Sequence, residues 1–234
     1  MATAVPVLTL LERGRLDVKG RLPWSSNLTF LGEVSLDGAT STVVYKPVRG
    51  ERPLWDFPRG LYKREVAAWA LSEALAWDLV PPTVARGGPL GRGSVQLFVD
   101  ADFEQHYFTL RENPSHHPAL ARICLFDVLA NNTDRKSGHC LLGRDGRIYA
   151  IDNALTFHTN WKLRTVIWDY AGERIPGPLL ADVRRFRTAG LPATLADLLE
   201  PEERRALRDR ADLVLSEGHF PVDPSGERYP WPLV

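Results

Sequence analysis

The segment from Phe126 to Phe157 constrains the possible structure and chemistry of this chain most. It reads FDVLANNTDRKSGHCLLGRDGRIYAIDNALTF. Two short apolar runs flank Asp145-Gly146, a dipeptide that favours a tight hairpin turn. Polar and charged residues crowd both sides of this predicted hairpin: Asp127, Asn131, Asn132, Asp134, Arg135, His139 and Asp152. Few structural roles explain so many polar groups there, so the segment predicts a functional site.

The order of elements in this segment indicates a reaction type. A helix end, a polar loop, two short strands and then an acidic residue form the arrangement in which kinase-like enzymes hold a base and a metal ligand beside ATP. We therefore expect Asp134 and Asp152 to be the two working carboxylates. Helical spacing from Leu120 to Ala130, and again from 178 to 217, predicts a mostly helical region around them.

The first hundred residues have a different pattern. Apolar alternation and turn residues predict strands at 16–21, 28–36, 42–46, 83–85 and 95–99, with one amphipathic helix at 61–76. The predicted fold is therefore α+β and two-lobed, of the protein-kinase-like kind. Residues 1–100 would form a small antiparallel β lobe with one helix, and residues 101–234 a mostly α-helical second lobe.

Two paired motifs resemble a known family. NNTDR followed by IDNALTF looks like the catalytic and metal-binding loops of type II phosphatidylinositol 4-kinases, within the wider phosphatidylinositol 3-/4-kinase-like family. Upstream, Tyr45-Lys46-Pro47 and YKREVAAWALSEAL resemble that family's small-lobe strand and helix. The resemblance covers about Trp24 to Phe157, and the chain also resembles a group of actinobacterial proteins with the same pattern.

The resemblance implies a role for several residues. Lys46 would hold the ATP phosphates, Glu65 would fix that lysine, and Asp134 would orient or deprotonate a hydroxyl acceptor. Asp152 would bind the Mg²⁺ or Mn²⁺ that bridges the phosphates. A phosphate-covering loop would include Ser25, Ser26 and Asn27. The strand between the lobes would offer Gln96, Leu97, Phe98 and Val99 to adenine.

One position departs from the family pattern. His139 stands where an asparagine is expected five residues after the catalytic aspartate. An imidazole can bind a metal but is a softer ligand than a carbonyl oxygen. The substitution therefore leaves three readings open: a preference for Mn²⁺, slower turnover, or a protein that binds nucleotide without transferring phosphate.

Composition excludes several other classes. The 29 basic and 29 acidic side chains balance in a chain of 234 residues, so no global field favours nucleic acid. No apolar run approaches the roughly 20 residues of a membrane span, and the N-terminal sequence is unlike a signal peptide. We therefore expect a cytoplasmic protein. Cys124 and Cys140 lack metal-ligand spacing and are expected to be buried thiols.

Several of these residues also have a structural interpretation as an alternative to the functional one. Asp134-Arg135 could be a surface ion pair, and Asn131-Asn132 a helix C-cap. Trp161 and Trp168, with basic residues between them, fit either a packed core segment or a loop in peripheral contact with a membrane. At the level of function, the alternatives to an ATP-dependent phosphotransferase are a regulatory pseudokinase and an AMP transferase.

Overall fold

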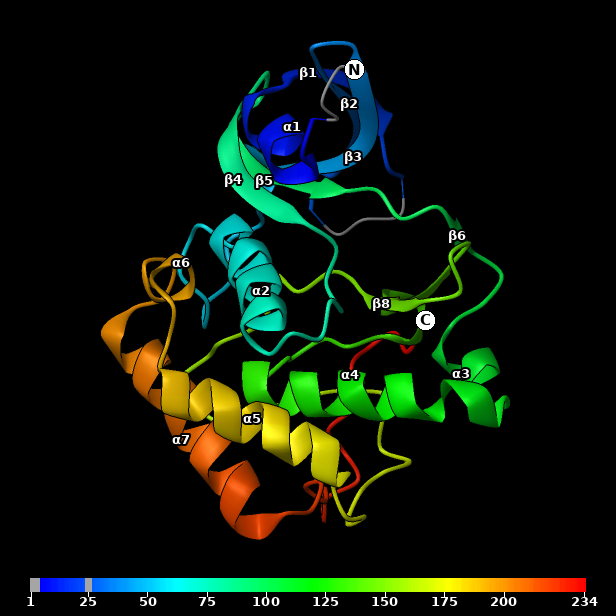
Figure 1. Cartoon of the computed structure of the whole chain (residues 1–234), viewed down its shortest axis with the longest axis vertical. Helices are drawn as coiled ribbons and strands as arrows, with labels where there is room; N and C mark the ends of the chain where they lie inside the picture. Colours follow the sequence, from blue (N-terminus) through cyan, green and yellow to red (C-terminus); the bar gives the residue numbers. More distant parts are fainter. Residues whose placement is uncertain (1–4, 24–26) are drawn as a thin grey trace.

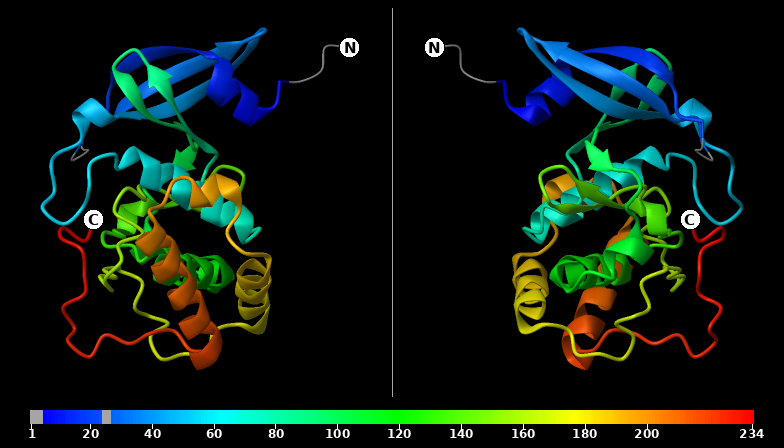
Figure 2. Two further views of the ribbon diagram at one scale, coloured as in Figure 1. Left: turned by 90° about the vertical axis from the view of Figure 1, so that its left-hand side faces the viewer. Right: turned by 90° about the vertical axis from the view of Figure 1, so that its right-hand side faces the viewer.

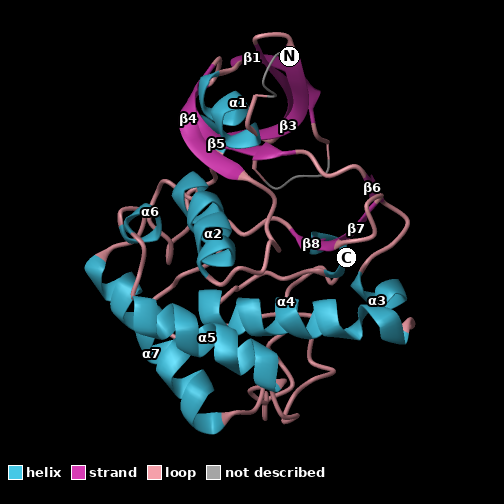
Figure 3. Cartoon of the chain, viewed as in Figure 1, coloured by secondary structure: helices cyan, strands magenta, loops and turns pink. Residues whose placement is uncertain are grey.

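A five-stranded antiparallel sheet forms the upper part of the molecule. The computed structural model describes residues 5–23 and 27–234. The sheet has the order β1-β2-β3-β5-β4, and Figure 3 shows it above most of the helices. Its strands are β1 (Arg15–Arg21), β2 (Phe30–Leu36), β3 (Ala39–Pro47), β4 (Thr83–Gly88) and β5 (Gly91–Leu97). The five strands predicted from the sequence all occur.

The turn between β2 and β3 follows from its two residues. Asp37 and Gly38 both have positive φ angles, 49° and 81°. Consecutive left-handed residues make the tight turn that matches the twist of antiparallel strands. This turn sets the register in which Phe30 pairs with Tyr45. On the other side of β3, Lys46 pairs with Ser94 of β5.

Two helices flank this sheet. Helix α1 (Val7–Arg13), which we did not predict, contributes Leu10 and Leu11 to a small core with residues of the strands. Helix α2 (Tyr62–Ala74) forms within the predicted range of 61–76 and contacts β4 and β5. However, its buried alanines and Leu71 belong to the large core of the lower part of the molecule. Helix α2 therefore connects both parts (Figure 1).

Helices and a small second sheet build the lower part. The order of this sheet is β6-β7-β8. Its strands are β6 (Ala101–Asp102), β7 (Cys140–Gly143) and β8 (Ile148–Ala150), so the predicted hairpin is present. The helices are α3 (Tyr107–Leu110), α4 (His117–Ala130), α5 (Gly177–Ala189), α6 (Ala193–Ala196) and α7 (Pro201–Glu217). Short 3-10 turns occur at η1 (Val48–Gly50), η2 (Pro114–His116) and η3 (Ser137–His139).

Two extended segments meet beside the cleft between the lobes. The loop at 51–61, between η1 and α2, descends from the upper part, and the tail at 221–234 rises from below to lie near it (Figure 2). The Glu51 carboxylate closes the loop by accepting hydrogen bonds from the N–H groups of Gly60 (2.8 Å) and Tyr62 (3.0 Å). None of the helices in the described ranges has the length and apolar character that crossing a bilayer requires.

Candidate active site

Lys46 is the centre of the candidate site. Strand β3 carries its side chain into the cleft, where the ammonium group forms an ion pair with Glu65 of α2. The same ammonium lies 2.9 Å from Oδ1 of Asp152, just after β8. Three residues separated by up to 106 positions in the sequence therefore meet around one cation. The structure brings together these three predicted residues.

Glu65 is held from the other side by the lower lobe. Its second carboxylate oxygen accepts the backbone N–H of Asn153 at 3.1 Å. The neighbouring Arg64 is buried, donates to the carbonyl oxygen of Thr156 at 2.9 Å, and forms a buried ion pair with Glu203 of α7. Helix α2 is thus fixed in the position that places Glu65 against Lys46.

The loop after α4 is built on a buried ion pair. Arg135 is fully buried and donates to Asp127 at 2.8–3.1 Å, so the reading of Asp134-Arg135 as a surface pair is wrong. The same guanidinium donates to the carbonyl of Ile151 (2.6 Å) and to the Asn153 side chain (2.7 Å). Arg135 therefore ties the loop that carries Asp134 to the loop that carries Asp152.

Two asparagines shape this loop further. Asn131 ends α4 with a φ of 52°, which confirms the reading of this residue as a helix C-cap. Asn132 donates to Asp127 at 3.1 Å, and its side-chain oxygen accepts the N–H of Asp134 at 2.9 Å. These bonds fix the backbone that presents the Asp134 carboxylate to the cleft.

Asp152 and His139 face one another. Asp152 has a φ of 54°, a left-handed conformation that Asp tolerates better than most residues. Nε2 of His139 lies 3.6 Å from Oδ2 of Asp152. When Nδ1 carries the proton, it donates to the carbonyl oxygen of Asp134 (3.1 Å) and leaves a lone pair on Nε2 beside that carboxylate.

This donor set fits a divalent cation that arrives with a nucleotide. Across the described residues, no group of three or more His, Cys, Asp or Glu side chains could hold a metal alone. Mg²⁺ is usually bound by only one or two carboxylates together with phosphate oxygens and water. Asp152 supplies one carboxylate and His139 one imidazole nitrogen, so phosphate oxygens and water would have to complete the coordination.

The charges in the cleft shift several pKa values. Burial lowers the pKa of Lys46, but the Asp152 and Glu65 carboxylates outweigh it and raise the pKa above its ordinary value. The Lys46 ammonium in turn lowers the pKa of Asp152. Burial lowers the pKa of His139 to about 4 and raises that of Asp134 to about 6. At pH 7 His139 is therefore neutral and Asp134 is mostly ionised.

One cavity of about 1100 Å³ contains the reacting end of this site. Lys46, Asp134, Lys136 and Asp152 line it, and so does Asn27. The Asn27 side chain accepts the N–H of Arg52 at 2.9 Å. Ser25 and Ser26, the other two residues of the predicted phosphate-covering loop, lie outside the described residues.

The four residues predicted to contact adenine lie apart from this cavity. Gln96 is buried in β5, donates its side-chain amide to Thr83 at 2.8 Å, and pairs with strands on both sides. The N–H groups of Leu97 and Phe98 donate to Pro82 and Thr42. Within the described chain the N–H of Val99 has no partner, so it is the backbone donor of the four that remains available to a base.

Sequence reasoning missed three supporting residues. Arg64 anchors α2, Asn153 links Glu65 to Arg135, and Lys136 lies 3.6 Å from the Asp134 carboxylate. Lys136 and Asn153 stand next to the predicted motifs, and their proximity was the available signal. Arg64 precedes Glu65, but its partner Glu203 is 139 residues away, and no local pattern marks that contact.

Comparison with known proteins gives a family and a fold. No family model matches the chain. "Protein Rv2133c" of Mycobacterium tuberculosis (strain ATCC 25618 / H37Rv) is 40% identical over 261 aligned positions, covering 95% of this chain and 94% of the relative. The chain belongs to the same family as Protein Rv2133c. Protein Rv2133c is thus expected to share this two-lobed architecture over almost its whole length.

Two solved structures resemble this Rv2133c-family chain in fold. The structure of hydra Fam20 with sugar has a TM-score of 0.57 at 15% identity, covering 90% of this chain and 87% of that one. The Helicobacter pylori proinflammatory kinase CtkA has a TM-score of 0.51 at 10% identity, covering 90% and 94%. The predicted α+β, two-lobed kinase-like fold is therefore confirmed.

Proposed function

We propose that this protein is an ATP-dependent phosphotransferase that moves the γ-phosphoryl group of ATP to a hydroxyl acceptor. The observation that carries the proposal is the position of Lys46 between Glu65 and Asp152, in one cavity with Asp134. A partly buried lysine held by two carboxylates is a fixed cation for phosphate oxygens. The kinase-like fold adds support, since kinases place these groups in the same order along the chain.

In this proposal each residue has a separate task. Lys46 binds the α- and β-phosphates, and Glu65 with the Asn153 backbone keeps its ammonium in place. Asn27 would cover the phosphates together with Ser25 and Ser26, and the N–H of Val99, with Leu97 and Phe98 beside it, would receive adenine. Such catalysis is mainly positioning and electrostatic stabilisation of charge on the transferred group.

Asp134 receives the proton of the acceptor hydroxyl. Its pKa of about 6 leaves it ionised at neutral pH, yet basic enough to accept a proton as the bond to phosphorus forms. Asp152 and neutral His139 would hold Mg²⁺ or Mn²⁺, which, when bound, neutralises the phosphate charges. Lys136, at 3.6 Å from Asp134, limits how far burial raises that pKa.

Narrower assignments are also proposals. The motif NNTDR with IDNALTF supports a relationship to type II phosphatidylinositol 4-kinases, and the hydra Fam20 structure with sugar makes a sugar hydroxyl another acceptor to test. We place the lobe boundary at residue 100 because β5 ends at Leu97 and β6 begins at Ala101. A pseudokinase remains the second candidate, favoured by His139 at the expected asparagine position.

The proposal predicts metal-dependent binding of ATP. We expect ATP with Mg²⁺ or Mn²⁺ to raise the Tm of the wild type, because a ligand that binds the native state stabilises it. Asp152→Asn, which keeps a residue that tolerates the left-handed φ, should lose that shift and the release of ADP. Asp209→Asn, at an exposed position of α7, is the matched control and should behave like the wild type.

The products separate the alternatives. ADP release indicates a kinase, pyrophosphate release an AMP transferase, and a metal-dependent Tm shift without product a pseudokinase. If neither metal supports a shift with ATP, or if Asp152→Asn keeps full activity, the assignment of this site is wrong.

A further inference from the structure

The cavity extends well beyond the residues that would hold ATP. Its volume is about 1100 Å³, and residues 96–99, predicted to contact adenine, are not among those that line it. Cavities of about 300 to 1,000 Å³ already hold a whole drug-sized ligand. Three segments enclose this end: 52–57 of the loop, 161–164 after Asp152, and 225–231 of the tail. The space is therefore sufficient for a second small molecule beside Asp134.

The walls of this space are rich in cations. Nζ of Lys162 forms an ion pair with Asp56 at 2.8 Å and lies 5.0 Å from the centroid of the Trp55 ring. These contacts fix the loop to the lower lobe. Arg52 and Arg164 also line the cavity and are exposed. Among residues 5–23 and 27–234, no carboxylate lies within ion-pair distance of either guanidinium. These two arginines remain available to an anion.

Aromatic side chains line the same space. Trp55 and Trp231 are 94% and 86% exposed, and Trp161 and Tyr229 are also exposed. All four line the cavity. Large aromatic side chains are on average mostly buried in proteins, so this exposure is unusual. Flat rings of this kind bury apolar ring faces while their polar edges remain in water. The combination suits a ligand that has both a ring or hydrocarbon face and a negative charge.

We propose that the acceptor is a small hydroxyl compound that carries a phosphate or carboxylate group, with the anion at Arg52 and Arg164 and its apolar face against Trp161 and Trp231. Arginine's planar donor fork suits both anions. This inference rests on the proposed function. The acceptor oxygen bonds to the γ-phosphorus, the bond from that phosphorus to the β–γ bridging oxygen breaks, ADP leaves, and the hydroxyl proton passes to Asp134 and then to water.

The test uses glucose 6-phosphate and glucose as a charged and a neutral probe. Titration calorimetry is carried out on the full chain loaded with Mg²⁺ and the non-hydrolysable ATP analogue AMP-PNP, so that phosphate cannot occupy the nucleotide site. We expect glucose 6-phosphate and inorganic phosphate to bind, and glucose to bind at least about tenfold more weakly. R52Q/R164Q should reduce binding of the charged probes about tenfold or more, roughly 1.4 kcal/mol.

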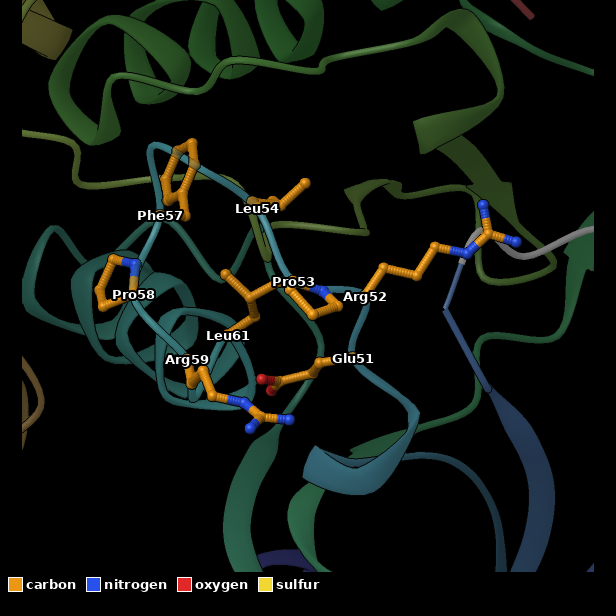
Figure 4. Close-up of a pocket in the computed structure, with 8 residues that line it drawn as sticks. All are labelled: Glu51, Arg52, Pro53, Leu54, Phe57, Pro58, Arg59 and Leu61. Atoms are coloured by element: carbon orange, nitrogen blue, oxygen red, sulfur yellow. The ribbon is translucent and has the colours of Figure 1, made fainter.

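A matched control lies on the same loop. Arg59 is exposed and lines a small cavity of about 40 Å³ in the loop (Figure 4). Arg52 lines both this cavity and the large one, whereas Arg59 does not line the large one. In that view Arg52 and Arg59 extend in different directions. Arg59→Gln should therefore leave binding of both charged probes unchanged, whereas an equal loss in Arg59→Gln would indicate a non-specific charge effect and overturn the inference.

The remaining outcomes separate this inference from the proposed function. If AMP-PNP binds but the charged probes bind no better than glucose, the inference fails and the nucleotide site stands. If AMP-PNP does not bind, the proposed function is wrong. The anion site can then still be tested on the protein without nucleotide: inorganic phosphate should bind to the wild type and not to R52Q/R164Q. Competition by phosphatidylinositol vesicles, but not by phosphatidylcholine vesicles, would identify a lipid headgroup as the source; no competition would indicate a soluble acceptor.

Discussion

At the scale of single residues, Asp134 lowers the stability of the folded protein at neutral pH. Asp134 has a folded-state pKa of about 6, raised first by burial and then by the Asp152 carboxylate. Because the folded state holds its proton more tightly than the unfolded state, this group's contribution to stability falls as pH rises from about 4 to about 6. The carboxylate that is basic enough to accept a proton in the cleft therefore lowers the stability of the protein at neutral pH.

This argument predicts the effect of Asp134→Asn. Neutralising the side chain removes the cost of a buried charge, which after allowance for solvent screening is about 1 kcal/mol. At pH 7.5, in EDTA, we expect the variant to unfold about 2 to 4 °C above the wild type, although phosphate transfer is lost. At pH 4 the difference should nearly vanish. A variant that is less stable than the wild type at both pH values would contradict this account of Asp134.

A second residue-scale prediction concerns the pair of Lys46 and Glu65. Lys46→Met leaves the Glu65 carboxylate buried without its cation, which should cost about 3 kcal/mol in the free energy of unfolding. Glu65→Gln in the same chain should recover much of that loss, because the uncompensated charge is gone. Urea unfolding measures both steps, and neither variant should transfer phosphate. Additive losses in the double variant would show that the two side chains do not interact.

At the scale of elements, α2 is positioned by the lower lobe. Arg64 connects it to the Thr156 carbonyl and to Glu203 of α7, and the helix shares the large core. Arg64→Met should therefore destabilise the protein by about 3 kcal/mol, since Glu203 would be left buried and unpaired. Because Arg64 acts only through the placement of Glu65, kcat should fall while the KM for the acceptor changes little.

A companion variant separates stability from positioning. Arg64→Met with Glu203→Gln should regain much of the stability, measured by urea unfolding, but not the kcat of the wild type. Full recovery of kcat in the double variant would mean that Arg64 contributes only stability and does not orient Glu65.

At the scale of the whole molecule, local sequence patterns predicted the helices and strands but not the long-range contacts between them. Strand alternation, helical spacing and Asp145-Gly146 each report on a few neighbouring residues, and the strands, α2 and the hairpin followed from them. Helix α1 is only seven residues long, too short to give a clear period. The partner of Arg64 and the position of the tail along the cleft depend on the packed core, which no single segment encodes.

The anchoring of α2 also determines what happens to the site when the cleft opens. Helix α2 is bonded to α7 through Arg64 and Glu203 and shares the large core, whereas Lys46 belongs to the five-stranded sheet. Any rotation that separates the sheet from the lower lobe must therefore pull Lys46 away from Glu65. In the proposed kinase, an open cleft would therefore be an inactive one, and release of ADP by opening would separate Lys46 from Glu65 until the sheet closes again.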